Sequence, residues 1–313
     1  MNGQMKVFHT LKQIKNINKS SVTIGVFDGV HLGHQRLIKQ TVKCAKKING
    51  TSVVITFKGH PDLYPGRKKG LSFIKSDEAK LRRLNMCGVD AVVMLDFAGI
   101  RGMDAADFVE KVLVAVLKAK YVVVGRDFVF GKNGKGNTAL LKELGKKYGF
   151  QVIIPPDFRI KGKRVSSTLI RHYLKKGDVK TVKKMLGRPY AIFGKVIRGR
   201  RAGFVFPTAN MKMAYGDAPA RGVWAVQVVH KSGKYYGAAN VGFAPTIKNL
   251  KEALLEVFIL NFNKNIYGDD LRVVFLERLR KEKKFKNRDA LIAQVKKDIG
   301  YIRRKYLRLK SAN

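Results

Sequence analysis

Two histidines in a glycine-rich segment are of the type and spacing that phosphate chemistry uses. Residues 25–34 read Gly-Val-Phe-Asp-Gly-Val-His-Leu-Gly-His, so His31 and His34 stand three apart and share one face of a helix. Gly33 between them has no side chain to block the approach of a nucleotide. Two imidazoles so placed can donate hydrogen bonds to phosphate oxygens as charge builds in a transition state. The alternative is a pair of surface histidines near a helix start.

Hydroxyl groups and an arginine form a second candidate phosphate contact. Residues 166–171 read Ser-Ser-Thr-Leu-Ile-Arg and open a predicted helix. The hydroxyls would either cap that helix or, together with the free backbone N–H groups, bind a triphosphate. In the second case Arg171 would neutralise phosphate charge.

Two further segments are weak signals on their own. His60 follows a predicted strand and would lie at the same sheet edge as His31, although alone its segment is interpreted as a turn. Residues 125–136 form a glycine-rich basic loop after another predicted strand, and its glycines suit a loop that lies close to a ligand.

The first half of the chain alternates short apolar strands with helical patterns. Because parallel strands covered on both faces read as continuous apolar runs, this half predicts a parallel α/β sheet. Residues 25–34 lie where a strand ends and a helix begins, which is where such sheets bind ligands and where N–H groups favour phosphate. The predicted helices cover residues 33–48 and a segment capped by Asp104. The predicted strands are 21–27, 51–57, 91–95, 120–124 and 151–154.

The second half of the chain changes character near residue 186. Turn signals separate strands of antiparallel type, and a basic helix with one apolar face covers residues 287–307. We therefore predict an α/β domain over residues 1–185 and a small antiparallel β-barrel with a C-terminal helix over residues 186–313. The predicted barrel strands are 190–197, 223–230, 235–241, 254–262 and 271–276.

The composition indicates a folded, strongly basic protein. The 313 residues include 64 Lys and Arg against 22 Asp and Glu, a net charge of +42, which attracts polyanions without selecting a reaction. Two cysteines exclude a disulfide framework and a four-thiolate zinc site, and they favour a reduced, cytoplasmic setting. No apolar run approaches the ~20 residues of a membrane span, and the first residues carry no apolar signal core.

Together these motifs, in this order, resemble the bacterial bifunctional riboflavin kinase/FAD synthetase family over nearly the whole chain. The resemblance implies a Rossmann-like HxGH nucleotidyltransferase domain, in which FMN attacks the α-phosphate of ATP and pyrophosphate leaves. His31 and His34 would act at the phosphates by positioning and electrostatics, without a covalent intermediate. The other nucleotide-binding positions that the resemblance implies are Gly25, Phe27, Asp28, Gly33, His60, Gly125, Asp127, Ser166, Ser167, Thr168 and Arg171.

The second half resembles the family's riboflavin kinase domain. Residues 206–210, Phe-Pro-Thr-Ala-Asn, resemble the kinase signature, in which Thr208 and Asn210 would hold Mg²⁺ and the phosphates of ATP. Taken without the family, Pro-Thr-Ala-Asn is interpreted as a turn.

Glu256 is the other kinase residue that the resemblance implies. It lies in residues 255–262, which with residues 240–246 resemble the next two blocks of the family. Glu256 would be the general base that takes the proton of the riboflavin 5′-hydroxyl as this attacks the γ-phosphate. Strand alternation places it opposite the apolar face, although without the family it is only a solvent-facing strand residue. The apolar face carries Leu255, Val257 and Ile259.

The phosphate loop of the kinase half departs from the family pattern. Gly199, a position that the resemblance places at the nucleotide, opens a loop shorter than the family's, and Val205 stands where the family has its last glycine. A β-branched residue resists positive φ, so the loop must follow a different path. One alternative function is therefore an FAD synthetase with an impaired kinase half.

The second alternative is a basic nucleic-acid-binding protein on the same scaffold. The basic residues are spread along the chain and no nucleic-acid-binding signature is present, which favours the enzyme. We expect riboflavin, FMN and ATP as substrates, Mg²⁺ as the metal, FMN and FAD as products, and incidental binding of RNA or other polyanions. Metal preference, oligomeric state and channelling between the two sites are left open by the sequence.

Overall fold

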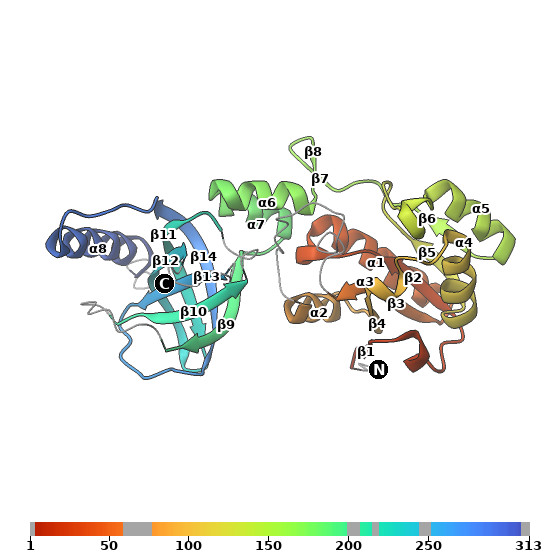
Figure 1. Cartoon of the computed structure of the whole chain (residues 1–313), viewed down its shortest axis with the longest axis horizontal. Helices are drawn as coiled ribbons and strands as arrows, with labels where there is room; N and C mark the ends of the chain where they lie inside the picture. Colours follow the sequence, from red (N-terminus) through yellow and green to blue (C-terminus); the bar gives the residue numbers. More distant parts are fainter. Residues whose placement is uncertain (1–3, 59–76, 199–206, 215–218, 244–251, 308–313) are drawn as a thin grey trace. The chain divides into compact units, whose positions relative to one another are not determined.

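The computed structural model describes residues 4–58, 77–198, 207–214, 219–243 and 252–307 (Figure 1). Contacts between residues divide the chain into two compact units, Met1–Ser167 and Thr168–Asn313. The domain boundary expected after residue 185 stays a prediction. Each unit has its own sheet and its own core, as two separate domains require.

The first unit is built on a six-stranded sheet in which every neighbouring pair is parallel. Its strand order is β1-β4-β3-β2-β5-β6, so β2, which leads into the histidine segment, lies inside the sheet between β3 and β5. This confirms the parallel sheet that the sequence predicts. The strands are β1 (Lys6–Phe8), β2 (Ser20–Ile24), β3 (Thr51–Lys58), β4 (Ala91–Asp96), β5 (Ala119–Val123) and β6 (Gln151–Ile153).

The two faces of this sheet bury different side chains, which explains the continuous apolar strands. In β3, Val53 and Ile55 join one core cluster with Val109, whereas Val54 joins another with Ile38. Successive side chains of a strand point to opposite faces, so helices on both sides make both faces apolar. The helices are α1 (Leu32–Lys47), α2 (Asp77–Met86), α3 (Phe97–Ile100), α4 (Ala105–Asp107), η4 (Phe108–Val116) and α5 (Thr138–Tyr148).

The second unit contains a closed barrel in the order β10-β13-β12-β11-β14-β9, with antiparallel pairing throughout (Figure 1). Trp224 and Leu255 are fully buried in it. This confirms the antiparallel barrel. The strands are β9 (Ala191–Ile197), β10 (Ala209–Ala214), β11 (Gly222–His230), β12 (Gly233–Phe243), β13 (Glu252–Ile259) and β14 (Asp270–Arg280).

Strand β10 corrects one interpretation made from the residues alone. Ala209 and Asn210 begin this strand, so Pro-Thr-Ala-Asn is not simply a turn. The strand is held by pairing with β13 and β9 rather than by strong local strand propensity, which a sequence pattern does not reveal.

Three helices complete the second unit: α6 (Ser167–Lys176), α7 (Val179–Leu186) and α8 (Arg288–Ile302), which continues as η6 (Arg303–Leu307). A buried ion pair of 2.9 Å between Arg280 and Asp298 fastens α8 to β14. Glu277 of β14 accepts hydrogen bonds from Tyr301, Lys305 and Tyr306. Within the described ranges, no helix is long and apolar enough to cross a membrane.

Candidate active sites

The turn between β2 and α1 has an unusual backbone. Phe27 has φ 51°, Gly29 φ 73° and Val30 φ 39°, all in the left-handed region. Such a φ is rare for phenylalanine and a genuine outlier for a β-branched valine. Phe27 and Val30 are each 1% exposed, so packing holds the turn in this conformation. Strain of this kind persists where the surroundings over-determine it, and functional sites are the common place for it.

The two histidines lie side by side at the start of α1. Their rings stack with centroids 3.5 Å apart, and the backbone N–H of His34 donates to His31 Nδ1 at 3.2 Å. Burial, then the charges of His31 and Arg164, lower the pKa of His34 well below its ordinary value. His34 is therefore a neutral imidazole near pH 7. Among the described residues its Nδ1 is buried and has no hydrogen-bond partner.

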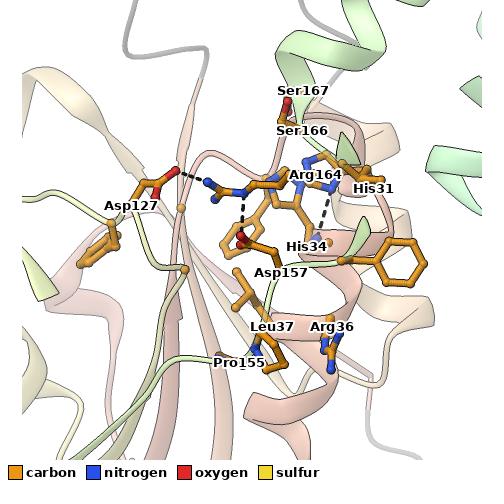
Figure 2. Close-up of a pocket in the computed structure, with 18 of the residues that line it drawn as sticks. His31, His34, Arg36, Leu37, Asp127, Pro155, Asp157, Arg164, Ser166 and Ser167 are labelled. Carbon is orange, nitrogen blue, oxygen red and sulfur yellow. Dashed lines mark hydrogen bonds and ion pairs between the residues drawn. The ribbon is translucent and has the colours of Figure 1, made fainter. Parts of the chain in front are cut away.

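A cavity of about 250 Å³ opens in front of these rings, and we name it the polar cavity for the charged side chains in its wall (Figure 2). Arg164 reaches into it and forms ion pairs with Asp127 and, at 3.2 Å, with Asp157. Ser167 Oγ donates to the backbone oxygen of Asp28 at 3.2 Å, which joins the end of this unit to the β2–α1 turn. The cavity thus combines donors, two arginines (Arg36 and Arg164) and a helix N-terminus, which is the set that binds phosphate.

Most of the predicted nucleotide residues line this cavity. They are Gly25, Phe27, His31, Gly33, His34, Gly125, Asp127, Ser166 and Ser167. Asp28 is buried beneath the turn at 4% exposure. Thr168 and Arg171 are not part of the lining, and His60 lies outside the described residues, so their contact with a nucleotide stays a prediction.

Arg164 and Asp157 are site residues that sequence reasoning missed. Asp157 follows β6, as Gly25 follows β2 and Gly125 follows β5. Because the carboxyl ends of parallel strands meet at one edge, residues directly after each strand were the available signal. Arg164 comes from the short hairpin of β7 (Arg159–Ile160) and β8 (Lys163–Arg164), for which no periodic signal exists.

A second cavity of about 350 Å³ adjoins the first and is largely apolar. The two cavities share Ile24, Gly25, Asp127 and Phe128 in their walls. The wall is rich in aromatic rings, which come from Phe57, Phe97, Phe108, Phe128 and Phe130. An aromatic lining of this kind suits a flat ring system. This cavity was not predicted from the sequence.

The barrel brings the kinase candidates together on its outer surface. Glu256 of β13 lies opposite Asn210 of β10 on one side and opposite Asn240 of β12 on the other. Leu255, Val257 and Ile259 are buried while Glu256 is half-buried, as the alternation predicts. Gly199 lies outside the described residues.

The residues proposed to hold Mg²⁺ are Thr208 and Asn210. Within the described ranges, no group of three or more His, Cys, Asp or Glu could hold a metal ion. Asn210 is 8% exposed and its Nδ2 donates to the backbone oxygen of Thr208 at 3.2 Å, which leaves the amide oxygen as the acceptor of that side chain. One hydroxyl and one amide oxygen fit a Mg²⁺ that takes its other ligands from phosphate and water.

Two family models divide the chain between them. The FAD synthetase model matches residues 13–169 and the riboflavin kinase model matches residues 186–306. The bifunctional riboflavin kinase/FMN adenylyltransferase of Haemophilus influenzae is 38% identical over 283 residues, which cover 89% of this chain and 92% of that one. The chain belongs to this bifunctional family. Its relative from Escherichia coli is 35% identical over 282 residues and 88% of this chain.

A solved structure supports the same two-part architecture. A crystal structure reported as a macrolide-efflux protein from Streptococcus pneumoniae matches with a TM-score of 0.78 and 31% identity, over 97% of this chain and 99% of that one. That name describes the other protein alone. Because both family models match, neither the reduced single activity nor the nucleic-acid-binding alternative is favoured.

Proposed function

We propose that the two activities of this family reside at two separate sites of this chain. Adenylyl transfer to FMN takes place at the polar cavity, which is lined by His31 and His34. Phosphorylation of riboflavin takes place on the outer surface of the barrel, at Asn210 and Glu256. The observation that carries the proposal is the polar cavity that shares a wall with an aromatic one. An adenylyltransferase for a flavin needs these two surfaces in contact, one for phosphates and one for a flat ring.

The polar cavity binds the phosphates of ATP in this proposal. His31 Nδ1 accepts a backbone hydrogen bond from His34, so the other ring nitrogen, Nε2, is the one that can donate to a phosphate oxygen. The positive end of α1 and the Arg164 guanidinium add electrostatic stabilisation. Arg164 exchanges its two carboxylate partners for phosphate oxygens, which match its planar donors equally well.

The aromatic cavity binds the flavin ring of FMN. Phe128 and Phe130 stack with centroids 5.4 Å apart, and Phe57 and Phe97 meet edge to face at 5.4 Å, so the walls are rigid. The shared wall at Gly25 and Asp127 brings the FMN phosphate next to the nucleotide. There an FMN phosphate oxygen bonds to the α-phosphorus of ATP, the bond to the bridging oxygen breaks, and pyrophosphate leaves with the electron pair.

On the barrel, Glu256 accepts the proton of the riboflavin 5′-hydroxyl. Thr208 and Asn210 hold Mg²⁺, which when bound neutralises charge on the phosphates of ATP. The half-buried position of Glu256, directly opposite Asn210, supports this pairing of base and phosphate site.

The proposal also covers the extent of the two domains, the cellular location and the binding of RNA. Residues 1–185 and 186–313 form the adenylyltransferase and the kinase domain, respectively. Free Cys44 and Cys87 and the use of ATP are consistent with a cytoplasmic enzyme. RNA binding through the net charge of +42 is incidental and weakens steeply with salt.

The test compares two variants with riboflavin, ATP and Mg²⁺, and separates the flavins by chromatography. The double variant His31→Ala/His34→Ala should accumulate FMN without FAD. Glu256→Gln should phosphorylate riboflavin about 10²–10⁴-fold more slowly but convert supplied FMN to FAD. His9→Ala, at an exposed histidine outside the cavity, is the matched control. A folded variant that loses both activities together would overturn the assignment to separate sites.

A further inference from the structure

Three polar side chains lie in one row across adjacent barrel strands. β13 lies between β10 and β12, and Glu256 is directly opposite Asn210 in the first pair and Asn240 in the second. Opposed residues of antiparallel strands point to the same face with Cβ atoms ~4.5–5.5 Å apart. Asn240 is therefore a direct cross-strand neighbour of the proposed base, as Asn210 is.

Asn240 makes a direct contact with the carboxylate. Its Nδ2 donates a hydrogen bond of 3.2 Å to Glu256 Oε2, and both side chains are half-buried. A hydrogen bond to a carboxylate is stronger than one between neutral groups. It restricts the rotation of a side chain that otherwise has three flexible torsions.

A second carboxylate, that of the exposed Glu282, lies near this contact. Two residues further along β12, a Cβ built on Gly242 would lie 3.1 Å from Glu282 Oε1 and 3.6 Å from Asn240 Nδ2. The amide nitrogen of Asn240 and a second carboxylate therefore border the same small volume. An amide oxygen in place of that nitrogen would set two acceptors against each other, and a carboxylate would add like charge, so the donor end of Asn240 is oriented toward Glu256.

We propose that Asn240 is the positioning residue of the kinase site, which holds one oxygen of Glu256 so that the other faces the riboflavin 5′-hydroxyl. The inference rests on the proposed role of Glu256 as the base. In the reaction the hydroxyl oxygen bonds to the γ-phosphorus, and the bond from phosphorus to the bridging oxygen breaks. ADP leaves with the electron pair, and the proton passes to the free oxygen of Glu256. A misplacement of ~1 Å in such a geometry can cost ~10²-fold in rate.

The experiment compares three substitutions of Asn240 in the full chain. Asn240→Asp keeps the shape and replaces the donor by a like charge, Asn240→Ala removes the side chain, and Asn240→Gln keeps a donor on a longer arm. Positioning predicts a kcat for riboflavin phosphorylation in the order Asn, Gln, Ala, Asp, with losses of about 10- to 100-fold for Ala. KM values should stay within about twofold, since the loss is in the transition state. If Asn240 only fills space, Asn240→Asp should instead keep nearly the parent kcat, because Asp is nearly isosteric with Asn.

A double-mutant cycle with Glu256→Gln sharpens the test. Once the base is gone, Asn240→Ala should cause no further loss of kcat, whereas an independent structural effect would add to the first loss. The matched control is Asn265→Ala. The side-chain oxygen of Asn265 accepts a hydrogen bond from the backbone N–H of Tyr267 in the same unit, and the substitution removes it. A thermal melt of each sample reports whether the barrel is folded, and FAD formation from supplied FMN reports the first unit.

The outcomes separate this inference from the proposed function. If Glu256→Gln phosphorylates riboflavin at the parent rate, the proposed role of Glu256 fails and Asn240 has no base to position. If Glu256→Gln is strongly slowed while Asn240→Asp and Asn240→Ala both keep the parent kcat, the role of Asn240 alone is overturned. If Asn240→Asp does not fold, the proposal is decided by the kcat values of Asn240→Gln and Asn240→Ala and by the double-mutant cycle with Glu256→Gln.

Discussion

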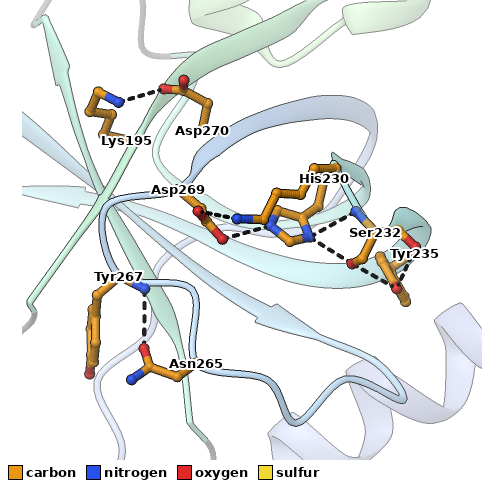
Figure 3. Close-up of polar contacts among 9 residues, drawn as sticks. Lys195, His230, Ser232, Tyr235, Asn265, Tyr267, Asp269 and Asp270 are labelled. Atoms are coloured by element: carbon orange, nitrogen blue, oxygen red, sulfur yellow. Dashed lines mark hydrogen bonds and ion pairs between the residues drawn. The ribbon is translucent and has the colours of Figure 1, made fainter.

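Two histidines, His34 in the first unit and His230 in the second, differ in how their ring nitrogens are bonded. In the second unit the His230 side chain is 2% exposed and both ring nitrogens have partners (Figure 3). Nε2 bonds to Asp269 Oδ2 at 2.9 Å, and Nδ1 accepts the backbone N–H of Ser232 at 3.2 Å and lies 2.7 Å from its hydroxyl. In the first unit His34 is half-buried, but its Nδ1 atom is buried without a partner among the described residues, and its ring adjoins a cavity.

The difference shows that burial of a histidine does not reveal its role. A buried polar atom without a partner costs free energy, so it persists only where something else requires it. The satisfied ring of His230 joins the β11–β12 turn to the start of β14 and stabilises the barrel. The ring of His34, which follows a strained turn, lines a cavity and keeps one nitrogen without a partner among the described residues. The following predictions test this contrast, in order of decreasing effect.

The largest effect is expected from His31→Ala. Removal of one preorganised donor should lower the rate of FAD formation from FMN by about 10²–10³-fold. The melting temperature should fall by only a few degrees, because the lost interactions are the cap of α1 and the stacking on His34, with a typical cost of about 1 kcal/mol for the cap. Steady-state kinetics with supplied FMN and a thermal melt on the same sample measure both. Loss of the fold with loss of activity would make His31 a structural residue like His230.

His230→Ala should have the reverse signature. Two hydrogen-bonded partners, Ser232 and Asp269, lose the ring, and a small cavity is left, so the free energy of unfolding should fall by about 2 kcal/mol. Both flavin activities should persist at low temperature. Urea denaturation gives the stability, and Lys195→Ala, which removes the ion pair with Asp270 in Figure 3, is a nearby control of small effect. A variant of parent stability would contradict the assigned role.

Acid should destabilise the first unit through His34. Burial lowers its pKa in the folded state below the ordinary 6.5, so below pH 6.5 the unfolded chain binds more protons and stability falls with pH. The slope is at most ~1.4 kcal/mol per pH unit for one proton. His34→Gln should show a smaller loss between pH 7 and pH 5, measured by denaturant unfolding at each pH. Equal losses in parent and variant would remove His34 as the cause.

The smallest effect is expected from Asp269→Asn. Hydrogen bonds from Lys231 and then His230 lower the pKa of Asp269 below its ordinary 3.8. Its contribution to stability is therefore present above that value and is lost as pH falls through the lowered pKa. The variant should lack this part of the acid transition and should be less destabilised at neutral pH than His230→Ala. A series of thermal melts from pH 7 to pH 2 measures it, and an unchanged acid transition would contradict it.

Local patterns were sufficient for most of the architecture. Continuous apolar runs predict buried parallel strands, and Val53 and Val54 do face different cores. The i, i+3 spacing of His31 and His34 predicts their juxtaposition, and the alternation around Glu256 predicts its face. Strands β1 and β10 were missed because short segments depend on their tertiary partners. Helix α5 was also missed, although Leu141 and Leu144 on its buried face, the Asn137 cap and Gly149 at its end are signals that the sequence carries.

The sequence by itself determined which faces of strands and helices are buried and where the phosphate chemistry lies, because both depend on residues near one another in the chain. Only the tertiary structure decided which distant residues meet. Arg164 joins Asp127 from 37 residues away, and the aromatic cavity collects rings from separate segments of the first unit. Asn240 reaches Glu256 because β12 pairs with β13 in one register, and a slip of one residue would turn Asn240 to the other face. Long-range pairing of this kind has no local periodicity, so no pattern in the sequence could have predicted it.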